Sequence, residues 1–367
     1  MTHRLVPRQP TGVHRYAASL ARALARSGNS GYFVATPIES PAPSPSLGVP
    51  YRPLPWARRR VQLAWSLGRG PVVERELGDL DLVHLLHPFP PVRTRAPLVV
   101  TIPDLTPIDH PSWFSARDRL LYGRSVELAV DRAQHIVAYS EAVATTIRSR
   151  WRLDAKRVTV IPLAADERFG TRPTDAAIAA ACRRHGLVAG SYVLHIGALV
   201  VRKNLPMLVR AVARLPRTVT LVLAGPGGNA ARDVAREAER CGVSDRVRLV
   251  GHVDDDELAA LLGGAALLAH PSHYEGFGLT LLEAMRAGVP VIAACTGAQP
   301  EVVGSAGLLL APSDVAGWTD AMLHLIDRCD ERERLAAAGR ARAATFTWSH
   351  VAEATARVHR GVIAGAR

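Results

Sequence analysis

Lysine is almost absent from this chain, although the chain is strongly basic. Of its 45 basic residues only Lys156 and Lys203 are lysines, and the formal net charge is +12 at pH 7. Such an excess of positive charge is typical of proteins that bind nucleic acid, an anionic membrane surface or an anionic substrate. The alternative is a coding bias toward arginine, which would have no functional meaning. No helix-turn-helix, zinc-finger or basic-zipper pattern is found, and no basic stripe interleaved with aromatics, so we expect no nucleic-acid partner.

Cysteine is scarce and widely spaced. The chain has four cysteines and no CxxC pair, which argues against the common zinc and redox motifs. We therefore expect four reduced, mostly buried thiols and neither a metal nor another cofactor. The cysteines are Cys182, Cys241, Cys295 and Cys329.

Long apolar runs are missing as well. No apolar stretch reaches 18 residues, and the first ten residues, MTHRLVPRQP, lack the apolar core of a signal peptide. We therefore expect a cytoplasmic protein. A hydrophobic content of 48% excludes a disordered chain. A chain of 367 residues exceeds what one core usually holds, which predicts two domains of about 150 to 200 residues each.

Short apolar runs alternate with helical patterns in the first half of the chain. Residues 11–26 carry a helical apolar stripe between Gly12 and Gly28. Alternation of this kind predicts a doubly wound parallel sheet in an α/β domain. The expected strands are 32–36, 82–86, 98–102, 136–139 and 158–162, and the further helices lie around 118–131 and 141–150.

The Pro- and Ser-rich stretch 40–55 is interpreted as a mobile loop. A helix over 56–70 should follow, with Trp56 and Trp65 beside Arg58, Arg59, Arg60 and Arg69. Such a helix could lie at the inner face of a membrane, or simply present a solvated arginine face. Both alternatives remain open from the sequence.

A second series of strands and helices follows the polar stretch 164–190 and predicts a second Rossmann-like domain. We place the N-terminal domain at 1–168 and the C-terminal domain at 185–345, with a last helix, 346–367, packing back on the N-terminal domain. The expected strands are 192–196, 219–224, 247–250, 267–269, 289–293 and 307–310, and the helices are 205–214, 231–241, 254–262, 279–287 and 315–328.

One element of the first domain is not found in the sequence. A helix that follows a glycine turn should be fed by a strand, yet only MTHRLVPRQP precedes it, with Leu5 and Val6 next to Pro7. The first strand of a doubly wound sheet is central. We therefore expect an N-terminal domain that lacks its first strand, and a translation start upstream of Met1 that would supply it.

The most informative segment is 271–290, PSHYEGFGLTLLEAMRAGVP. Gly276, Phe277 and Gly278 form a loop that allows close backbone approach, and Leu279 begins a helix whose free N–H groups suit a diphosphate. Glu283 in this helix is placed to bind two ribose hydroxyls, and Glu275 in the loop to bind hydroxyls of a sugar. A solvated helix glutamate after a glycine turn is the alternative.

Here the sequence resembles the family 4 retaining glycosyltransferases. The segment EGFGLTLLEAMRAGVPVI is similar to their E-x7-E signature, and GALVVRKN at 197–204 is similar to their phosphate-binding segment. Further similar segments occur in family order over nearly the whole chain. They are TGVHRY (11–16), IVAYSE (136–141), LAGPGG (223–228), GHVDDDEL (251–258) and PEVVG (300–304).

The resemblance implies a GT-B fold, two Rossmann-like domains facing across a cleft, and a metal-independent retaining transfer of a hexose. The donor-binding residues it implies are Gly197, Arg202, Lys203, Gly225, Val253, Glu275, Gly276, Phe277, Gly278, Leu279 and Glu283. Gly12, Val13, Tyr16 and Asp104 are the implied acceptor-binding residues. Catalytic roles fall to Glu275, Lys203 and Asp104, with Lys203 and Arg202 neutralising the donor diphosphate. A surface lysine ahead of a helix is the alternative for Lys203.

The chain departs from the family pattern after the strand at 98–102. Pro103 stands where the family usually has a histidine, and proline can donate neither a proton nor a hydrogen bond. Asp104 is then either an acceptor-side base or the cap of a turn. His84 and His87 are a further possibility, although such histidines are more often structural.

Two functions therefore remain in competition. The first is a mannose-like hexosyltransferase that uses a nucleotide-sugar, with GDP-mannose as the first expectation by analogy, and a sugar, a lipid-linked or a small-molecule acceptor. The second is a catalytically silent GT-B scaffold or accessory protein, which Pro103 and the short segment ahead of the first helix favour. The run Asp254, Asp255 and Asp256 is interpreted as a helix cap and first turn and not as a metal site.

Overall fold

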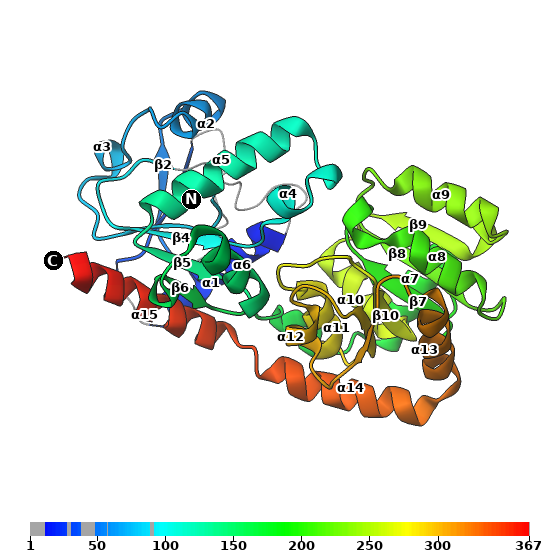
Figure 1. Cartoon of the computed structure of the whole chain (residues 1–367). Helices are drawn as coiled ribbons and strands as arrows, with labels where there is room; N and C mark the ends of the chain where they lie inside the picture. Colours follow the sequence, from blue (N-terminus) through cyan, green and yellow to red (C-terminus); the bar gives the residue numbers. More distant parts are fainter. Residues whose placement is uncertain (1–11, 28–30, 38–47, 57, 89–91, 367) are drawn as a thin grey trace. The chain divides into compact units, whose positions relative to one another are not determined.

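The computed structural model describes residues 12–27, 31–37, 48–56, 58–88 and 92–366, and they form two units (Figure 1). The first unit comprises Met1–Leu163 and Thr347–Arg367, and the second Ala164–Phe346. The helix expected over 346–367 is α15 (Trp348–Ala366), which belongs to the first unit and packs on α1 (Gly12–Arg26). The Trp348 ring lies 6.4 Å from that of Tyr16 on α1.

The first unit contains parallel strands and flanking helices in the alternation that the sequence predicts. Its strands are β1 (Val34–Pro37), β2 (Tyr51–Leu54), β3 (Val83–Leu85), β4 (Leu98–Ile102), β5 (His135–Ala138) and β6 (Val158–Val160). Its other helices are α2 (Arg58–Ser66), α3 (Glu74–Leu77), α4 (Thr106–Asp109), α5 (Ala116–Arg132) and α6 (Glu141–Trp151). Ser115 and Ser140 start α5 and α6 by accepting a hydrogen bond from a backbone N–H three residues on.

The sheet of the first unit is divided. Strands β3, β4, β5 and β6 pair in that order, while β1 pairs with β2 in a separate parallel sheet. Residues 1–11, which precede α1, lie outside the described part, so the predicted lack of a first strand stays a prediction. The division lies between β1 and β3, next to the place where a doubly wound sheet has its central strand.

The second unit has one six-stranded parallel sheet, ordered β12-β11-β10-β7-β8-β9. Its strands are β7 (Tyr192–Ile196), β8 (Thr220–Ala224), β9 (Val247–Gly251), β10 (Leu267–His270), β11 (Val291–Ala294) and β12 (Leu308–Leu310). The helices are α7 (Asp175–His185), α8 (Leu205–Ala213), α9 (Ala231–Arg240), α10 (Asp255–Gly264), α11 (Leu279–Arg286), α12 (Gln299–Val303), α13 (Val315–Asp327) and α14 (Cys329–Ala344). Strands β7, β8, β10 and β11 are almost fully buried, as expected for a parallel sheet covered on both faces.

The chain of the second unit winds outward in two directions from β7. Strands β8 and β9 lie on one side of β7, and β10, β11 and β12 lie on the other. The direction changes between β7 and β10, which pair through Val193 and Leu268 among others. In open α/β sheets ligands bind outside the carboxyl ends of the strands at such a switch point. The loops that leave β7 and β10 are therefore the first place to look for a site.

Two sequence-based expectations are wrong, and one long helix is absent from the predicted elements. Residues 51–54, expected within a mobile loop, form β2 because they pair with β1, while residues 40–47 lie outside the described part. The long helix α14 was not expected, because its alanine- and arginine-rich sequence has almost no apolar periodicity. The thiols are not mostly buried: Cys182 is buried and Cys241 half-buried, whereas Cys295 and Cys329 are exposed.

Candidate functional site

Two glycines bring the loops after β7 and β8 into close contact. Gly225 has φ 153° and Gly197 has φ 147°, conformations that side chains disfavour. A Cβ atom on Gly225 would lie 2.1 Å from the carbonyl oxygen of Gly197. The two backbones can therefore cross here only without a side chain at position 225. At position 197 the positive φ favours glycine, and a Cβ atom there would lie 3.1 Å from Cε of Lys203.

The loop after β7 ends in a short helical turn that carries Arg202 and Lys203. Asn204 follows with φ 54°, a left-handed conformation that asparagine tolerates. Its Nδ2 donates to the carbonyl oxygens of Pro271, at 3.3 Å, and Pro312, at 2.7 Å. Asn204 thus ties the basic turn to the loop after β10, where the second half of the site begins.

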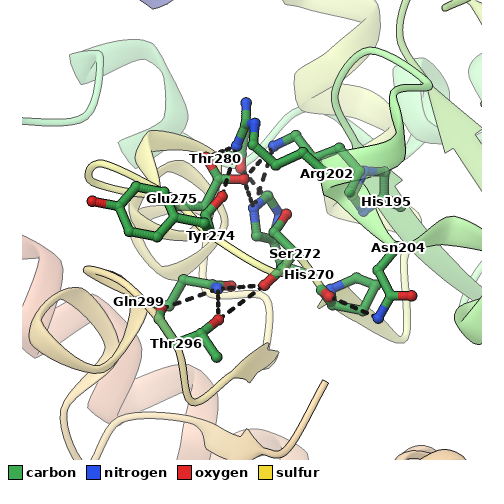
Figure 2. A network of polar contacts seen from close by, with 12 residues as sticks. His195, Arg202, Asn204, His270, Ser272, Tyr274, Glu275, Thr280, Thr296 and Gln299 are labelled. Carbon is green, nitrogen blue, oxygen red and sulfur yellow. Dashed lines mark hydrogen bonds and ion pairs between the residues drawn. The ribbon is translucent and has the colours of Figure 1, made fainter. Parts of the chain in front are cut away.

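The Glu275 carboxylate forms ion pairs with both Arg202 and Lys203 (Figure 2). The Lys203 ammonium donates to Oε1 of Glu275 at 2.7 Å, and Nη1 of Arg202 donates to Oε2 at 2.6 Å. Nε2 of His270, the last residue of β10, lies 3.1 Å from the same Oε1. Lys203 and Glu275 are 7% and 9% exposed, so this ion pair is shielded from water.

The pKa values in this cluster follow from burial and from the two cations. Burial lowers the pKa of Lys203, and the nearby Glu275 carboxylate opposes that effect. Burial alone would raise the pKa of Glu275, but Arg202, Lys203 and His270 together hold it well below its usual range. Burial, and then the charge of Lys203, lower the pKa of His270 to about 4. At neutral pH the cluster therefore has two cations, one carboxylate and a neutral imidazole.

The loop that carries Glu275 is held by the segment between β11 and α12 and by the first residue of that helix. The backbone N–H of Ala298 donates to the Glu275 carbonyl oxygen at 3.0 Å. Nε2 of Gln299 and Oγ1 of Thr296 donate to the carbonyl oxygen of Ser272, at 2.9 and 3.0 Å (Figure 2). These bonds hold the Glu275 carboxylate in place without using the carboxylate itself, so it stays available to its cationic partners.

Helix α11 begins immediately after this loop. Gly278 precedes it with φ 106°, and Leu279 is its first residue, so the free N–H groups of the first turn follow directly on the glycine loop. Phe277 is buried and its ring packs on that of Phe346, 6.0 Å away. Glu283 is 2% exposed in the second turn of α11. A helix start and two cations thus converge at the carboxyl ends of β7 and β10.

Not every predicted donor-binding residue belongs to this cluster. Val253 is half-buried between β9 and α10, and none of the described contacts joins it to Glu275 or Lys203. The neighbouring Asp254 accepts a hydrogen bond from the Glu257 N–H at 2.9 Å and caps α10. The interpretation of the aspartate run as a cap and first turn is therefore confirmed.

The predicted acceptor-binding residues lie in the first unit. Gly12 and Val13 begin α1, and beyond their helical backbone they lie outside the described part. Tyr16 is 2% exposed and its ring packs edge-on against that of Tyr139 at 4.9 Å. Burial raises the pKa of Tyr16 to about 12. In this structure Tyr16 is a core residue of α1, and its hydroxyl does not reach solvent.

Asp104 follows β4 and occupies a turn. Its Oδ1 accepts a hydrogen bond from the Thr106 N–H at 2.9 Å, and its carbonyl oxygen accepts one from the Tyr122 hydroxyl at 2.7 Å. The structure thus gives Asp104 the turn-capping role, and a second role as a base is left as a prediction.

His84 belongs to a buried chain of hydrogen bonds. Its Nε2 lies 2.9 Å from Oγ1 of Thr101, and its Nδ1 lies 2.9 Å from Nε2 of His359 on α15. The other nitrogen of His359 lies 3.0 Å from the hydroxyl of Tyr32. Both nitrogens of His84 are used within the fold, which favours the structural interpretation for this residue.

Sequence reasoning missed three polar residues of the site. His270 binds Glu275, His195 stacks on His270 with ring centroids 5.4 Å apart, and Asn204 joins the two loops. Their positions in the sequence could have indicated the two histidines. His195 lies in an apolar strand, and His270 is the last residue of another apolar strand, five residues ahead of Glu275. Polar residues at the carboxyl ends of buried strands are expected to face a ligand site.

Comparison with known proteins agrees with this geometry. The Glycosyltransferase Family 4 model matches residues 10–169, and the model for Glycosyl transferases group 1 matches residues 190–328. The O-antigen chain mannosyltransferase B of Escherichia coli is 30% identical over 267 residues, which are 71% of this chain and 70% of that protein. The D-inositol 3-phosphate glycosyltransferase of Xylanimonas cellulosilytica is 33% identical over 304 residues, 80% of this chain and 70% of that protein.

A solved structure has the same fold. The crystal structure of Anabaena Alr3699/HepE in complex with UDP and glucose aligns with a TM-score of 0.77 at 21% identity, covering 98% of both chains. This chain spans 70% of the length of the Escherichia coli relative, but only 50% of the length of the D-inositol 3-phosphate glycosyltransferase of Mycobacterium bovis. In the described residues no helix is both long and apolar enough to cross a membrane. The chain belongs to glycosyltransferase family 4, whose members have the GT-B fold of two Rossmann-like α/β domains.

Proposed function

We propose that the chain transfers a hexose from a nucleotide-sugar to an acceptor hydroxyl, with retention of configuration and without a metal ion. The observation that carries the proposal is the pair of cations, Arg202 and Lys203, held on the single carboxylate of Glu275 at the switch point of the second unit. One carboxylate cannot neutralise both the buried Lys203 and the half-buried Arg202, so the cluster attracts a further anion. The diphosphate of a nucleotide-sugar has the matching charge.

The leaving group explains why two cations suit this reaction. As the sugar departs, negative charge gathers on the diphosphate, and preorganised cations in a water-poor site stabilise that charge strongly. The guanidinium of Arg202 suits two phosphate oxygens at once, while Lys203 supplies a point charge. The free N–H groups at the start of α11 add donors for the same anion. These groups suffice for the charge without a metal ion.

Glu275 has a second role once a diphosphate takes over the two cations. Its carboxylate can then accept hydrogen bonds from hydroxyls of the transferred sugar, beside the glycine loop 276–278. Glu283, in the buried second turn of α11, is proposed to bind the ribose. Retention is supported only by family membership, and we propose that the leaving diphosphate oxygen helps to take the acceptor proton, with Asp104 as the alternative base.

The mannosyltransferase relative supports a mannose-like sugar. The first expectation for the donor is GDP-mannose, and the UDP in the complex of the Anabaena protein keeps UDP-sugars as the competing class. A thermal-shift series with GDP, UDP, ADP and dTDP sugars would decide, because a ligand that binds only the folded state raises the melting temperature. A rise with none of the four classes would contradict the donor site.

Transfer must then be separated from binding. Release of the nucleoside diphosphate, followed with a panel of sugar acceptors, measures turnover, and the anomeric configuration of the product tests retention. If the chain binds the donor but neither transfers the sugar nor hydrolyses the donor, the catalytically silent scaffold is favoured. Pro103, which replaces the usual histidine, is the reason to test this outcome. A requirement for a divalent cation, seen as loss of turnover with EDTA, would contradict metal independence.

A second candidate property concerns α2 and the turn that follows it. Leu63 and Leu67 are 60% and 57% exposed near the basic Arg60 and Arg69, which supports contact with an anionic membrane surface. Trp65 takes no part, because it is fully buried and its Nε1 donates to the Pro71 carbonyl oxygen. Co-sedimentation with vesicles with and without anionic lipid tests the contact, and binding unchanged in Leu63→Ser would overturn it.

A further inference from the structure

His270 lies where the cations, the carboxylate and the helix start of the candidate site meet. It is the last residue of β10, its side chain is fully buried, and its ring stacks on that of His195 of β7 with centroids 5.4 Å apart. Nδ1 of His195 lies 3.0 Å from the Ala269 carbonyl oxygen, and this hydrogen bond fixes the supporting ring. The fold therefore holds one face of the His270 imidazole, and both of its nitrogens contact other groups of the site (Figure 2).

The two nitrogens of His270 contact different elements. Nε2 lies 3.1 Å from Oε1 of Glu275, and Nδ1 lies 3.4 Å from Oγ1 of Thr280 in the first turn of α11. One ring thus connects the Glu275 carboxylate with the helix start whose N–H groups are proposed to bind the diphosphate.

The neighbours determine which nitrogen of His270 carries the proton. An ionised carboxylate can only accept hydrogen bonds, so the 3.1 Å contact with Glu275 requires the proton on Nε2. The Lys203 ammonium lies further from Nε2, at 3.5 Å, and already donates to Oε1 at 2.7 Å. Burial, and then the charge of Lys203, lower the pKa of His270 to about 4, so the ring is neutral at pH 7 and Nδ1 is an acceptor. The Thr280 hydroxyl can then donate to Nδ1, and this bond selects the tautomer that serves Glu275.

The bond from His270 gains importance when a diphosphate binds. Among the described residues, three side chains donate to the Glu275 carboxylate, namely Arg202, Lys203 and His270. In the proposed function Arg202 and Lys203 turn to the diphosphate. The neutral His270 has no comparable attraction to a phosphate, so it stays on Oε1. A carboxylate that accepts hydrogen bonds from sugar hydroxyls needs such a fixed donor to keep its orientation.

We propose that His270 is a positioning residue for sugar transfer. Its Nε2–H orients the Glu275 carboxylate toward the sugar hydroxyls, and the Thr280 hydroxyl holds His270 in the tautomer that does so. This inference rests on the proposed function, because a diphosphate must take over the two cations. His270 itself touches no substrate and transfers no proton. Its effect therefore belongs to turnover of the nucleotide-sugar and not to binding of the nucleoside diphosphate.

Two pairs of substitutions in the full chain test this role. His270→Gln places an amide nitrogen near the position of Nε2 and keeps a donor for Glu275, whereas His270→Asn places it near the position of Nδ1 and leaves Oε1 without that donor. Thr280→Ser keeps the hydroxyl, and Thr280→Val keeps the shape without it. The measurements are kcat/KM with the nucleotide-sugar that the thermal-shift series selects, Kd of its nucleoside diphosphate by calorimetric titration, and the melting temperature.

The two pairs should separate turnover from diphosphate binding. We expect His270→Asn to lower kcat/KM about tenfold to a hundredfold, the size of effect typical of a misplaced group, while Kd of the diphosphate stays within about twofold. Thr280→Val should show the same pattern to a smaller extent. His270→Gln and Thr280→Ser should restore most of the activity, because each keeps the hydrogen bond in question.

Equal kcat/KM within both pairs would overturn the proposal. So would a parallel loss of diphosphate binding and turnover in His270→Asn or Thr280→Val, since the residue would then hold the loops together or bind the phosphate itself. If His270→Asn does not fold, the Thr280 pair decides, because Thr280 is only half-buried and both replacements are close to it in size. An unaltered chain that binds no nucleoside diphosphate would instead overturn the proposed function, and this inference with it.

Discussion

The ammonium of Lys203 lies 2.7 Å from Oε1 of Glu275, and the guanidinium of Arg202 lies 2.6 Å from Oε2 of the same carboxylate. This arrangement keeps both cations in place through an internal anion. A buried cation without a counterion would strongly destabilise the folded chain. Glu275 therefore stabilises the two cations that an incoming diphosphate needs. The first two predictions each replace one residue of this cluster.

Lys203→Ala should reduce transfer at least a hundredfold while the fold is retained. Removal of one preorganised charge donor typically costs about 10²–10³ in rate, and Glu275 would keep Arg202 as a partner. Steady-state turnover together with the melting temperature measures both effects. Lys156→Ala is the matched control, since Lys156 is the other lysine of the chain and is exposed. Turnover retained in Lys203→Ala would refute its assignment to the leaving group.

Glu275→Gln should separate donor binding from transfer. The substitution keeps the size of the side chain and removes its charge, so Arg202 and Lys203 would lose their internal counterion. We expect a nucleoside diphosphate to bind at least as tightly as to the unaltered chain, while turnover falls about a hundredfold because the sugar loses its acceptor group. Calorimetric titration with the diphosphate measures the first effect.

The control for this variant is Glu239→Gln on the exposed face of α9. Loss of diphosphate binding in parallel with turnover would contradict the two roles given to Glu275, because the carboxylate would then act only by holding the loops together.

Gly225→Ala should damage the donor site through the backbone. The new methyl group would meet the Gly197 carbonyl oxygen at 2.1 Å and force the two loops apart. We expect donor binding to fall at least tenfold and the free energy of unfolding to fall by about 1–3 kcal/mol. Gly227→Ala, two residues on in open space, is the control and should change neither quantity. Equal behaviour of the two variants would show that the crossing has no role in binding.

The second unit could be predicted from the sequence more completely than the first. Its strands are apolar runs bounded by glycine and polar residues, and those at 192–196 and 267–269 match β7 and β10 to within a residue. Local pattern was sufficient because these strands are buried on both faces. The glycine loop and Glu275 were found because backbone constraint and charge leave local traces in the sequence.

The missed features depend on contacts between distant residues. Strand β2 exists because Tyr51–Leu54 pairs with Val34–Pro37, and its proline-containing sequence gives no such indication. The bonding of His270 to Glu275 follows from the end of one strand and the shape of the next loop.

The two interpretations of Asp104 can be separated by a pair of substitutions. Asp104→Asn keeps an oxygen that can accept from the Thr106 N–H, now at 2.9 Å, but cannot act as a base. Asp104→Ala removes both properties. If Asp104 only caps the turn, Asp104→Asn should have nearly normal turnover and only Asp104→Ala should lose stability, by about 1 kcal/mol. A hundredfold loss of turnover in Asp104→Asn, with an unchanged melting temperature, would show that Asp104 is the acceptor-side base.

The buried histidine His359 should make the first unit sensitive to acid. Burial, and then the charge of Arg360, lower the pKa of His359 to about 4, while its nitrogens remain bonded to Tyr32 and His84. In the unfolded chain this histidine takes up a proton near pH 6.5, whereas in the folded chain it stays neutral down to about pH 4. The unfolded state therefore binds more protons between these values, and stability is lost as the pH falls.

Replacing His359 by a residue that does not titrate tests this account of acid sensitivity. The single group contributes about 1.4 kcal/mol of unfolding free energy per pH unit within the window between pH 6.5 and 4. His359→Gln should remove that part of the slope, although the variant is less stable at pH 7 because the hydrogen bonds to Tyr32 and His84 are disturbed. Urea unfolding of both proteins at pH 7, 6 and 5 gives the two slopes. Parallel slopes would mean that other groups cause the acid sensitivity, His84 foremost, since burial and the neighbouring His359 also lower its pKa.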